Sequence, residues 1–187
     1  MAQFFDEISP ERASFIAAQK MFFVATAPAP DKGRVNVSPK GMDTFRVLGP
    51  NRVAYLDVTG SANETAAHLR DNGRITLMFC AFEGKALILR LYGTGRVITR
   101  ADAEWPEMLA LFPPRESPRQ VIDVTVGAVQ TSCGEGVPLY DHVGDRMALD
   151  DWARSKGPKG MADYMRTKNL VSIDGLPTGL PVPEEAE

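Results

Sequence analysis

Short apolar runs, several of them alternating with polar residues, divide this chain into strand-like segments. Residues 21–27 form a continuous apolar run typical of a buried strand, whereas Val35 and Val37 alternate with polar neighbours along 34–38. Similar patterns predict five further strands, at 45–48, 53–58, 74–81, 85–98 and 119–131. Most connections are too short for a crossover helix, so we expect antiparallel pairing. The pattern predicts a mainly β fold with peripheral helices, closed into a small barrel that hides its sheet edges.

Helix signals occupy the longer gaps between these strands. Ser9-Pro10 predicts the start of a short helix, with the serine as N-cap. Ser61 and Glu64 match a capping box for a second helix, which Asn72-Gly73 would end. Further helices are predicted over 101–112, 150–156 and 160–168.

The chain divides into two predicted parts. No clear linker precedes residue 145, and the tail from Gly175 is rich in proline and glutamate, which is typical of an extended segment. We therefore expect a barrel domain over residues 1–145, followed by a C-terminal helical arm and an extended tail over 146–187.

Composition and charge narrow the class of protein. A chain of 187 residues can bury one sizeable core, and a net charge of -3 argues against a nucleic-acid-binding surface. No apolar run approaches the roughly 18 residues that a membrane span needs. Acidic residues precede any Lys or Arg at the N-terminus, so we expect no secretory signal. Cys80 and Cys133 make no disulfide framework, which favours a reduced, cytoplasmic setting.

The turn between the strand at 53–58 and the predicted second helix is one candidate anion site. Thr59 and Ser61 supply two hydroxyls beside the positive end of a helix, which suits a phosphate. The alternative is a plainly capped helix, and Glu64 favours it because its carboxylate would repel a phosphate near the cap. Asp57, just before the turn, could accept hydrogen bonds from a ligand or could cap the turn at Gly60.

Two strands carry polar side chains that fit either a ligand site or an ordinary surface. Arg34, Asn36, Ser38 and Lys40 form a polar row, which is either a solvated strand face or the wall of a pocket with Lys40 as the phosphate cation. Arg90 interrupts an apolar run, and it points either outward to solvent or inward to an anion. His68 and His142 lack metal-ligand spacing, so we expect no metal site, and no residue stands out as a catalytic acid or base.

Four segments, taken in order, resemble one known family. They are 35–41 (VNVSPKG), 55–64 (YLDVTGSANE), 72–79 (NGRITLMF) and 89–93 (LRLYG). Over about residues 15–135 the chain is similar to the pyridoxamine 5'-phosphate oxidase-like family of FMN-binding split-barrel proteins. The resemblance implies a six-stranded antiparallel split barrel, a homodimer, and FMN held at the dimer interface.

The resemblance also implies which residues contact the cofactor. Together with the turn residues, the predicted FMN-binding positions are Val35, Ser38, Lys40, Leu56, Asp57, Thr59, Ser61, Asn63 and Arg90. Two departures separate this chain from the true pyridoxamine phosphate oxidases. Ala62-Asn63 replaces the Arg-Lys pair that grips the phosphate, so the cations must come from Lys40 or from an arginine elsewhere, or be replaced by hydroxyls and helix N–H groups. The C-terminal Trp-to-Arg-Leu segment that helps to hold pyridoxal is not matched either.

The resemblance predicts an FMN-dependent oxidoreductase that transfers a hydride between the flavin and a small organic substrate, with a nicotinamide as a candidate electron donor. Three alternatives stay open. The chain could be a non-enzymatic flavin- or haem-binding protein, a true pyridoxamine 5'-phosphate oxidase, or a dimeric scaffold without a ligand.

Overall fold

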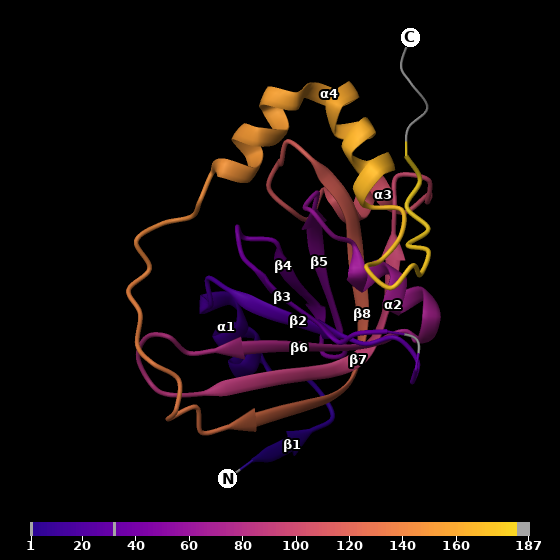
Figure 1. The fold of residues 1–187 in the computed structure, drawn as a ribbon. Helices are drawn as coiled ribbons and strands as arrows, with labels where there is room; N and C mark the ends of the chain where they lie inside the picture. Colours follow the sequence, from indigo (N-terminus) through magenta and orange to yellow (C-terminus); the bar gives the residue numbers. More distant parts are fainter. Residues whose placement is uncertain (1, 32, 183–187) are drawn as a thin grey trace.

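One antiparallel sheet organises the protein, as the computed structural model shows for residues 2–31 and 33–182 (Figure 1). The strand order is β3-β2-β6-β7-β8-β5-β4, and the short β1 pairs with the end of β8. The strands are β1 (Gln3–Phe5), β2 (Phe22–Thr26), β3 (Asn36–Lys40), β4 (Phe45–Gly49), β5 (Arg52–Val58), β6 (Arg74–Cys80), β7 (Ile88–Ile98) and β8 (Pro118–Ser132).

The predicted fold class is confirmed, but the strand count differs, and the expected closure of the barrel is wrong because β3 and β4 do not pair in the described residues. The sheet is antiparallel, curled, and flanked by four helices in the described residues: α1 (Pro10–Ala18), α2 (Glu64–Asn72), α3 (Trp105–Leu109) and α4 (Ala148–Lys168). It has eight strands where the resemblance implied six. Sequence patterns marked seven of these strands, and the eighth, β1, is too short at three residues to show a period.

The helix signals succeed at α1 and fail at the start of α2. Ser9 caps α1 by accepting a hydrogen bond from the Arg12 N–H at 3.3 Å. The predicted capping box is wrong, because α2 begins at Glu64 after Asn63, and the Glu64 carboxylate instead accepts from the Ile173 N–H at 2.9 Å. The backbone of the C-terminal segment therefore binds the Glu64 carboxylate that the capping box would have used.

Two other helices differ in length from their predictions. The helix predicted over 101–112 is reduced to the five residues of α3, because Asp102 closes a turn on Thr99 by accepting from its N–H at 2.7 Å. The helices predicted over 150–156 and 160–168 are both present within α4. Gly157 (φ 66°, ψ 174°) breaks the helix between them just before Pro158, so α4 is an arch (Figure 1).

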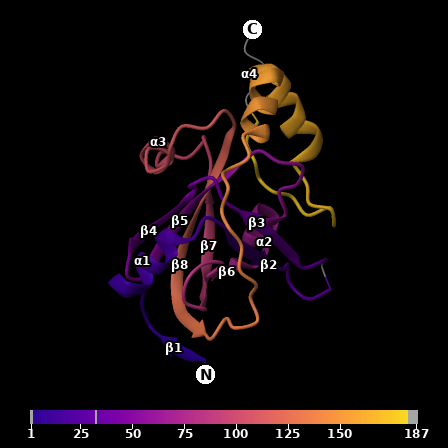
Figure 2. The same ribbon diagram turned by 90° about the vertical axis from the view of Figure 1, so that its left-hand side faces the viewer.

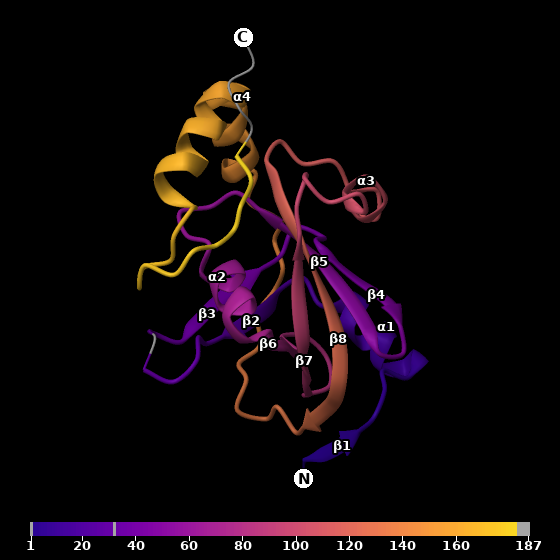
Figure 3. The same ribbon diagram turned by 90° about the vertical axis from the view of Figure 1, so that its right-hand side faces the viewer.

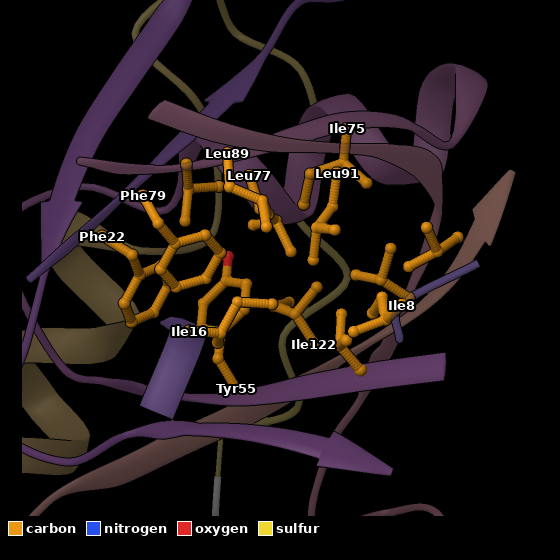
Figure 4. Close-up of a cluster of buried hydrophobic side chains, with 14 of the residues drawn as sticks. Ile8, Ile16, Phe22, Tyr55, Ile75, Leu77, Phe79, Leu89, Leu91 and Ile122 are labelled. Carbon is orange, nitrogen blue, oxygen red and sulfur yellow. The ribbon is translucent and has the colours of Figure 1, made fainter. Parts of the chain in front are cut away.

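Large apolar side chains fill the barrel. Phe22, Tyr55 and Phe79 pack ring against ring, with Phe22 at 5.5 Å from Tyr55 and 5.7 Å from Phe79 between centroids (Figure 4). Leu77, Leu91 and Ile122 complete the same cluster. Two smaller clusters lie outside the barrel, one under α3 and one within the arch of α4.

The chain after β8 takes an outer course. Residues 133–147 have no regular secondary structure and run along one side of the barrel to α4, which lies at the end opposite the N-terminus (Figures 1 and 2). The segment after α4 then returns beside α2 (Figure 3). In residues 2–31 and 33–182, no helix combines the length and apolar character that crossing a membrane requires.

Candidate functional site

A buried carboxylate at the end of β5 accepts hydrogen bonds from charged and polar side chains of two other strands, β3 and β8. Asp57 accepts hydrogen bonds from Lys40 Nζ at 2.7 Å, from Arg119 Nη2 at 2.6 Å and Nε at 3.1 Å, and from Gln120 Nε2 at 2.9 Å. Its side chain is 3% exposed. We call Lys40, Asp57, Arg119 and Gln120 the Asp57 cluster. In this cluster, the fixed donors of Lys40, Arg119 and Gln120 take the place of the water that would otherwise solvate the Asp57 carboxylate.

Strand register explains why these residues meet. Side chains alternate along β5, so Asp57 continues the row of Val53 and Tyr55 that faces the barrel interior. Asp57 pairs with Gln120 in the antiparallel β5–β8 ladder, which brings the start of β8 alongside. Lys40 is the last residue of β3, and its stem reaches across the barrel end to the same carboxylate.

The charges in the cluster are unequally buried. The Arg119 side chain is 3% exposed and that of Lys40 is 23% exposed. Burial alone would raise the pKa of Asp57, but the charges of Arg119 and Lys40 and their hydrogen bonds outweigh it. The pKa of Asp57 is therefore held well below its usual range, so the carboxylate stays ionised at neutral pH.

A small polar cavity of about 30 Å³ adjoins the cluster. Its other lining side chains form a hydrogen-bonded row: Ser38 donates to Asn36 Oδ1 at 3.0 Å, and Asn36 donates to Thr65 Oγ1 at 3.2 Å. The cavity is close to the volume that one water molecule occupies in the liquid. A larger anion would therefore sit at its mouth, where Lys40 is partly exposed, rather than inside.

The start of α2 opens onto the same cavity. Asn63 occupies the N-cap position but makes no side-chain cap hydrogen bond. Its amide instead accepts from Gln120 at 2.7 Å and donates to the Asn169 carbonyl at 3.4 Å. The first N–H groups of α2 thus lack a side-chain cap, and they present the positive end of the helix dipole near Lys40 and Arg119.

The structure brings together four of the predicted cofactor-binding residues. Ser38, Lys40, Asp57 and Asn63 all line the small cavity. The polar row at 34–40 is therefore the wall of a pocket at Asn36, Ser38 and Lys40, on the side of β3 that faces the barrel end.

The other predicted positions lie elsewhere. Thr59 is fully buried, and its hydroxyl accepts from Ser117 Oγ at 2.7 Å, so it is committed to the packing of the turn. Ser61 is exposed outside the cavity, and Leu56 packs in the apolar cluster under α3. The Ser61 prediction depended on the turn running straight into the helix, whereas α2 begins at Glu64.

Val35 and Arg90 lie on the outer side of the sheet. Val35 is 71% exposed, and it precedes β3. Arg90 is half-buried and donates to Ser132 Oγ at 3.3 Å, while its neighbours Leu89 and Leu91 fill the core. The inward orientation considered for Arg90 is therefore wrong within one protomer.

Arg119 and Gln120 are the residues that sequence reasoning did not single out. They begin a strand whose pattern resembles any other buried strand, and only the pairing with β5 places them beside Asp57. The lost Arg-Lys pair was the available signal, because it called for an arginine from another segment. Arg119 is an arginine from another segment that lies beside Ala62, and it donates to the Ala62 carbonyl at 2.8 Å.

A curled antiparallel sheet with a cationic cluster at one barrel end defines a split-barrel protein. The sequence model of the pyridoxamine 5'-phosphate oxidase family matches residues 8–133. The chain therefore belongs to the pyridoxamine 5'-phosphate oxidase family.

Relatives and solved structures agree with this assignment. The pyridoxamine 5'-phosphate oxidase family protein ustO of Aspergillus flavus is 38% identical over 195 residues, which cover 95% of this chain and 78% of that protein. A variant of HupZ from Group A Streptococcus has a similar fold, with a TM-score of 0.54 and 24% identity over 67% of this chain and 99% of that chain. A candidate pyridoxamine 5'-phosphate oxidase of Lactobacillus delbrueckii gives a TM-score of 0.52 and 21% identity, over 67% of this chain and 94% of that chain.

Proposed function

We propose that this protein is an FMN-dependent oxidoreductase whose phosphate site is built on the Asp57 cluster. The observation that carries the proposal is the pair of cations, Lys40 and Arg119, that share one buried carboxylate at the start of α2. They supply the positive charge that Ala62-Asn63 lacks. The proposal is supported by family membership and by the two cations that line the cavity. Glu64 also lines the cavity, but its carboxylate accepts a hydrogen bond from the Ile173 N–H at 2.9 Å.

The donor set fits a phosphate monoester at the mouth of the cavity. Lys40 uses one of its three ammonium protons on Asp57, and Arg119 uses three of its five N–H donors on Asp57 and Ala62. The remaining donors belong to cations, and charge-assisted bonds to phosphate are the strongest that side chains make. Thr65 and the N-terminus of α2 add neutral donors beside them, whereas the Ser38 hydroxyl already donates to Asn36.

In the proposed reaction, the cofactor would supply the redox chemistry and the protein would bind and orient it. Bound FMN would supply hydride transfer to or from a small organic substrate, with a nicotinamide as the candidate electron donor. Lys40 would donate to the phosphate at the mouth of the cavity, the buried Arg119 would add positive charge beneath it, and Asp57 would fix the two cations in place. No general acid or base is assigned, because His68 is buried against Thr26 at 3.0 Å and His142 lies on the exposed segment 133–147.

We further propose a homodimer with the cofactor at its interface, over a flavin-binding domain of residues 1–145 and a C-terminal arm of 146–187. Exposed apolar side chains support the dimer. On β3 and just before it, Val37 and Val35 are 62% and 71% exposed. On the outer segment, Leu139 and Val143 are 74% and 99% exposed. Exposed apolar side chains of this kind are what a second copy of the chain would cover, provided that the two groups form one contiguous patch in the dimer.

FMN titration of the purified protein, followed by flavin fluorescence, tests the phosphate site. Lys40→Ala should weaken FMN binding about tenfold to a hundredfold, because a charge-assisted hydrogen bond contributes about 1.5–3 kcal/mol. Lys85→Ala, which removes an exposed lysine from the β6–β7 hairpin, should leave the affinity unchanged. Equal affinity of Lys40→Ala and the unaltered protein would remove the Asp57 cluster from the site.

Anaerobic bleaching of bound FMN by a nicotinamide, with recovery of colour on adding an oxidised substrate, tests the oxidoreductase. A bound flavin that no donor bleaches would favour a non-enzymatic flavin-binding protein instead.

A further inference from the structure

The arch of α4 encloses a second and much larger cavity. It has a volume of about 520 Å³ and lies between α4 and the residues that lead into β8. Figure 1 shows α4 arched above the loop that joins α3 to β8, with the two halves of the helix meeting at an angle. A cavity of this size is in the range that small-molecule sites occupy.

The break in α4 is what makes room for the cavity. Gly157 adopts φ 66°, which L residues rarely tolerate, and Pro158 cannot continue the preceding hydrogen-bond ladder. The two halves of α4 therefore diverge over Ser117 and Pro118 rather than packing flat on the barrel.

The floor of the cavity is apolar and adaptable. Met161 and Met165 are each 5% exposed and belong to the cluster within the arch. Ala153, Ala162 and the ring of Pro118 line the same space. Methionine side chains are flexible and polarisable, so they fit an apolar body of varied shape.

The lining of the cavity is strongly cationic. Arg100, Arg154, Lys159 and Arg166 all line it, against the single carboxylate of Glu116. Glu116 forms an ion pair with Arg154 at 2.9 Å, and Arg154 forms a second ion pair with Asp151 at 2.8 Å.

Two of the cations have no carboxylate partner within residues 2–31 and 33–182. Arg100 donates there only to the Pro118 carbonyl, at 3.4 Å, and Lys159 has no ion pair. Both side chains are exposed, so they are free to turn toward an anion, and they stand beside an apolar floor.

We propose that this cavity binds an amphipathic organic anion, with its acidic group held by Arg100 and Lys159 and its apolar body against Met161 and Met165. The site is separate from the proposed flavin site. Pro118 lines this cavity, whereas the next residue, Arg119, lines the cavity beside Asp57. Successive strand residues face opposite sides, so one stretch of β8 forms a wall of both sites.

Isothermal titration with octanoate and with its neutral amide, octanamide, tests the proposal. The two probes share the apolar chain and differ in charge. We expect octanoate to bind at least about tenfold more tightly, as one charge-assisted hydrogen bond would give. The double change Arg100→Gln with Lys159→Gln should remove this preference while octanamide binding stays unchanged.

Two further variants separate the cavity from general surface charge. Arg146→Gln removes an exposed cation outside the cavity and should leave both affinities unchanged. Ala162→Phe should place a ring beside the apolar floor and weaken binding of both probes, with circular dichroism as the check on folding.

Three outcomes would overturn the proposal: no binding of octanoate to the unaltered protein, equal binding of octanoate and octanamide, or a preference for octanoate that survives the double change.

Discussion

The replacement Asp57→Asn tests how much the buried ion cluster stabilises the fold. Asparagine keeps the shape of the side chain but removes the charge. Its NH₂ group would replace one of the two carboxylate oxygens that accept hydrogen bonds from the cations, and an NH₂ group cannot accept them. Arg119 cannot escape to water, because its side chain is 3% exposed and lies between β5 and α2. The change therefore leaves a buried guanidinium without its counter-charge.

The expected loss follows from that unequal burial. Removing one partner of a buried ion pair costs about 3–5 kcal/mol, because the other charge stays desolvated. Lys40 is 23% exposed and can turn toward solvent, which recovers part of its hydration. We therefore expect the free energy of unfolding to fall by about 3 kcal/mol, near the lower limit of that range. This is a large part of the total for a typical domain, which is roughly 5–15 kcal/mol.

Urea unfolding at pH 7 measures this loss as a change in the free energy of unfolding. Asp123→Asn is the matched control, because Asp123 is also a buried carboxylate between two arginines. Its partners Arg52 and Arg96 are 48% and 53% exposed, so they rehydrate when the charge is removed. We expect about 1 kcal/mol or less there. A loss for Asp57→Asn no greater than for Asp123→Asn would refute the reasoning.

Three further predictions follow from the same structure. The pKa of Asp57 is lower in the folded protein than its ordinary value of 3.8, so Asp57 stabilises the fold above pH 3.8 and this stabilisation is lost as the pH falls below it. In urea titrations at a series of acidic pH values, Asp57→Asn should therefore reduce the decrease in the free energy of unfolding with falling pH. Gly93→Ala should cost about 1–3 kcal/mol in thermal unfolding, since a Cβ there would clash with the Thr125 carbonyl, whereas Gly49→Ala meets nothing within 4 Å and should be near neutral. Light scattering should give a dimer that Val37→Lys converts to a monomer; a dimer that persists would exclude this face.

The strands and their packing were predictable because each depends on a local period. Val53, Tyr55 and Asp57 alternate with residues of the opposite face, and the structure keeps that alternation with one barrel-facing row. Gly73 ends α2 at φ 73°, as the Asn-Gly pair predicted. Signals of this kind need only neighbours within one turn or one strand.

The errors arise where distant chain enters a local motif. Ser61 and Glu64 have the spacing of a capping box, but Asn169 donates to the Gly60 carbonyl at 3.0 Å and the Glu64 carboxylate accepts from Ile173. Those bonds hold the turn open and move the N-cap from Ser61 to Asn63, so α2 starts two residues later than predicted. A motif of four residues carries no information about a partner more than a hundred positions away.

Arg119 illustrates the same limit at the candidate site. Its position in the sequence identifies it only as the first residue of a strand, and its role depends on the offset at which β8 pairs with β5. A shift of one residue would turn Arg119 toward the α4 cavity and Pro118 toward Asp57. Register therefore decides which of the two cavities holds the guanidinium.

The C-terminal arm is part of the site even though the matched family region ends at residue 133. Asn169 is fully buried, and its carbonyl accepts from Asn63 at 3.4 Å and from Thr178 Oγ1 at 2.7 Å, while its amide donates to the turn at Gly60. The N-terminus of α2 is thus shaped by a residue that follows α4. Since Asn63 also accepts from Gln120, which donates to Asp57, a continuous row of hydrogen bonds joins the arm to the cations. A change in how the arm packs would move Asn63 at the end of this row. The packing of the arm and the geometry of the cationic cluster are therefore coupled through these hydrogen bonds.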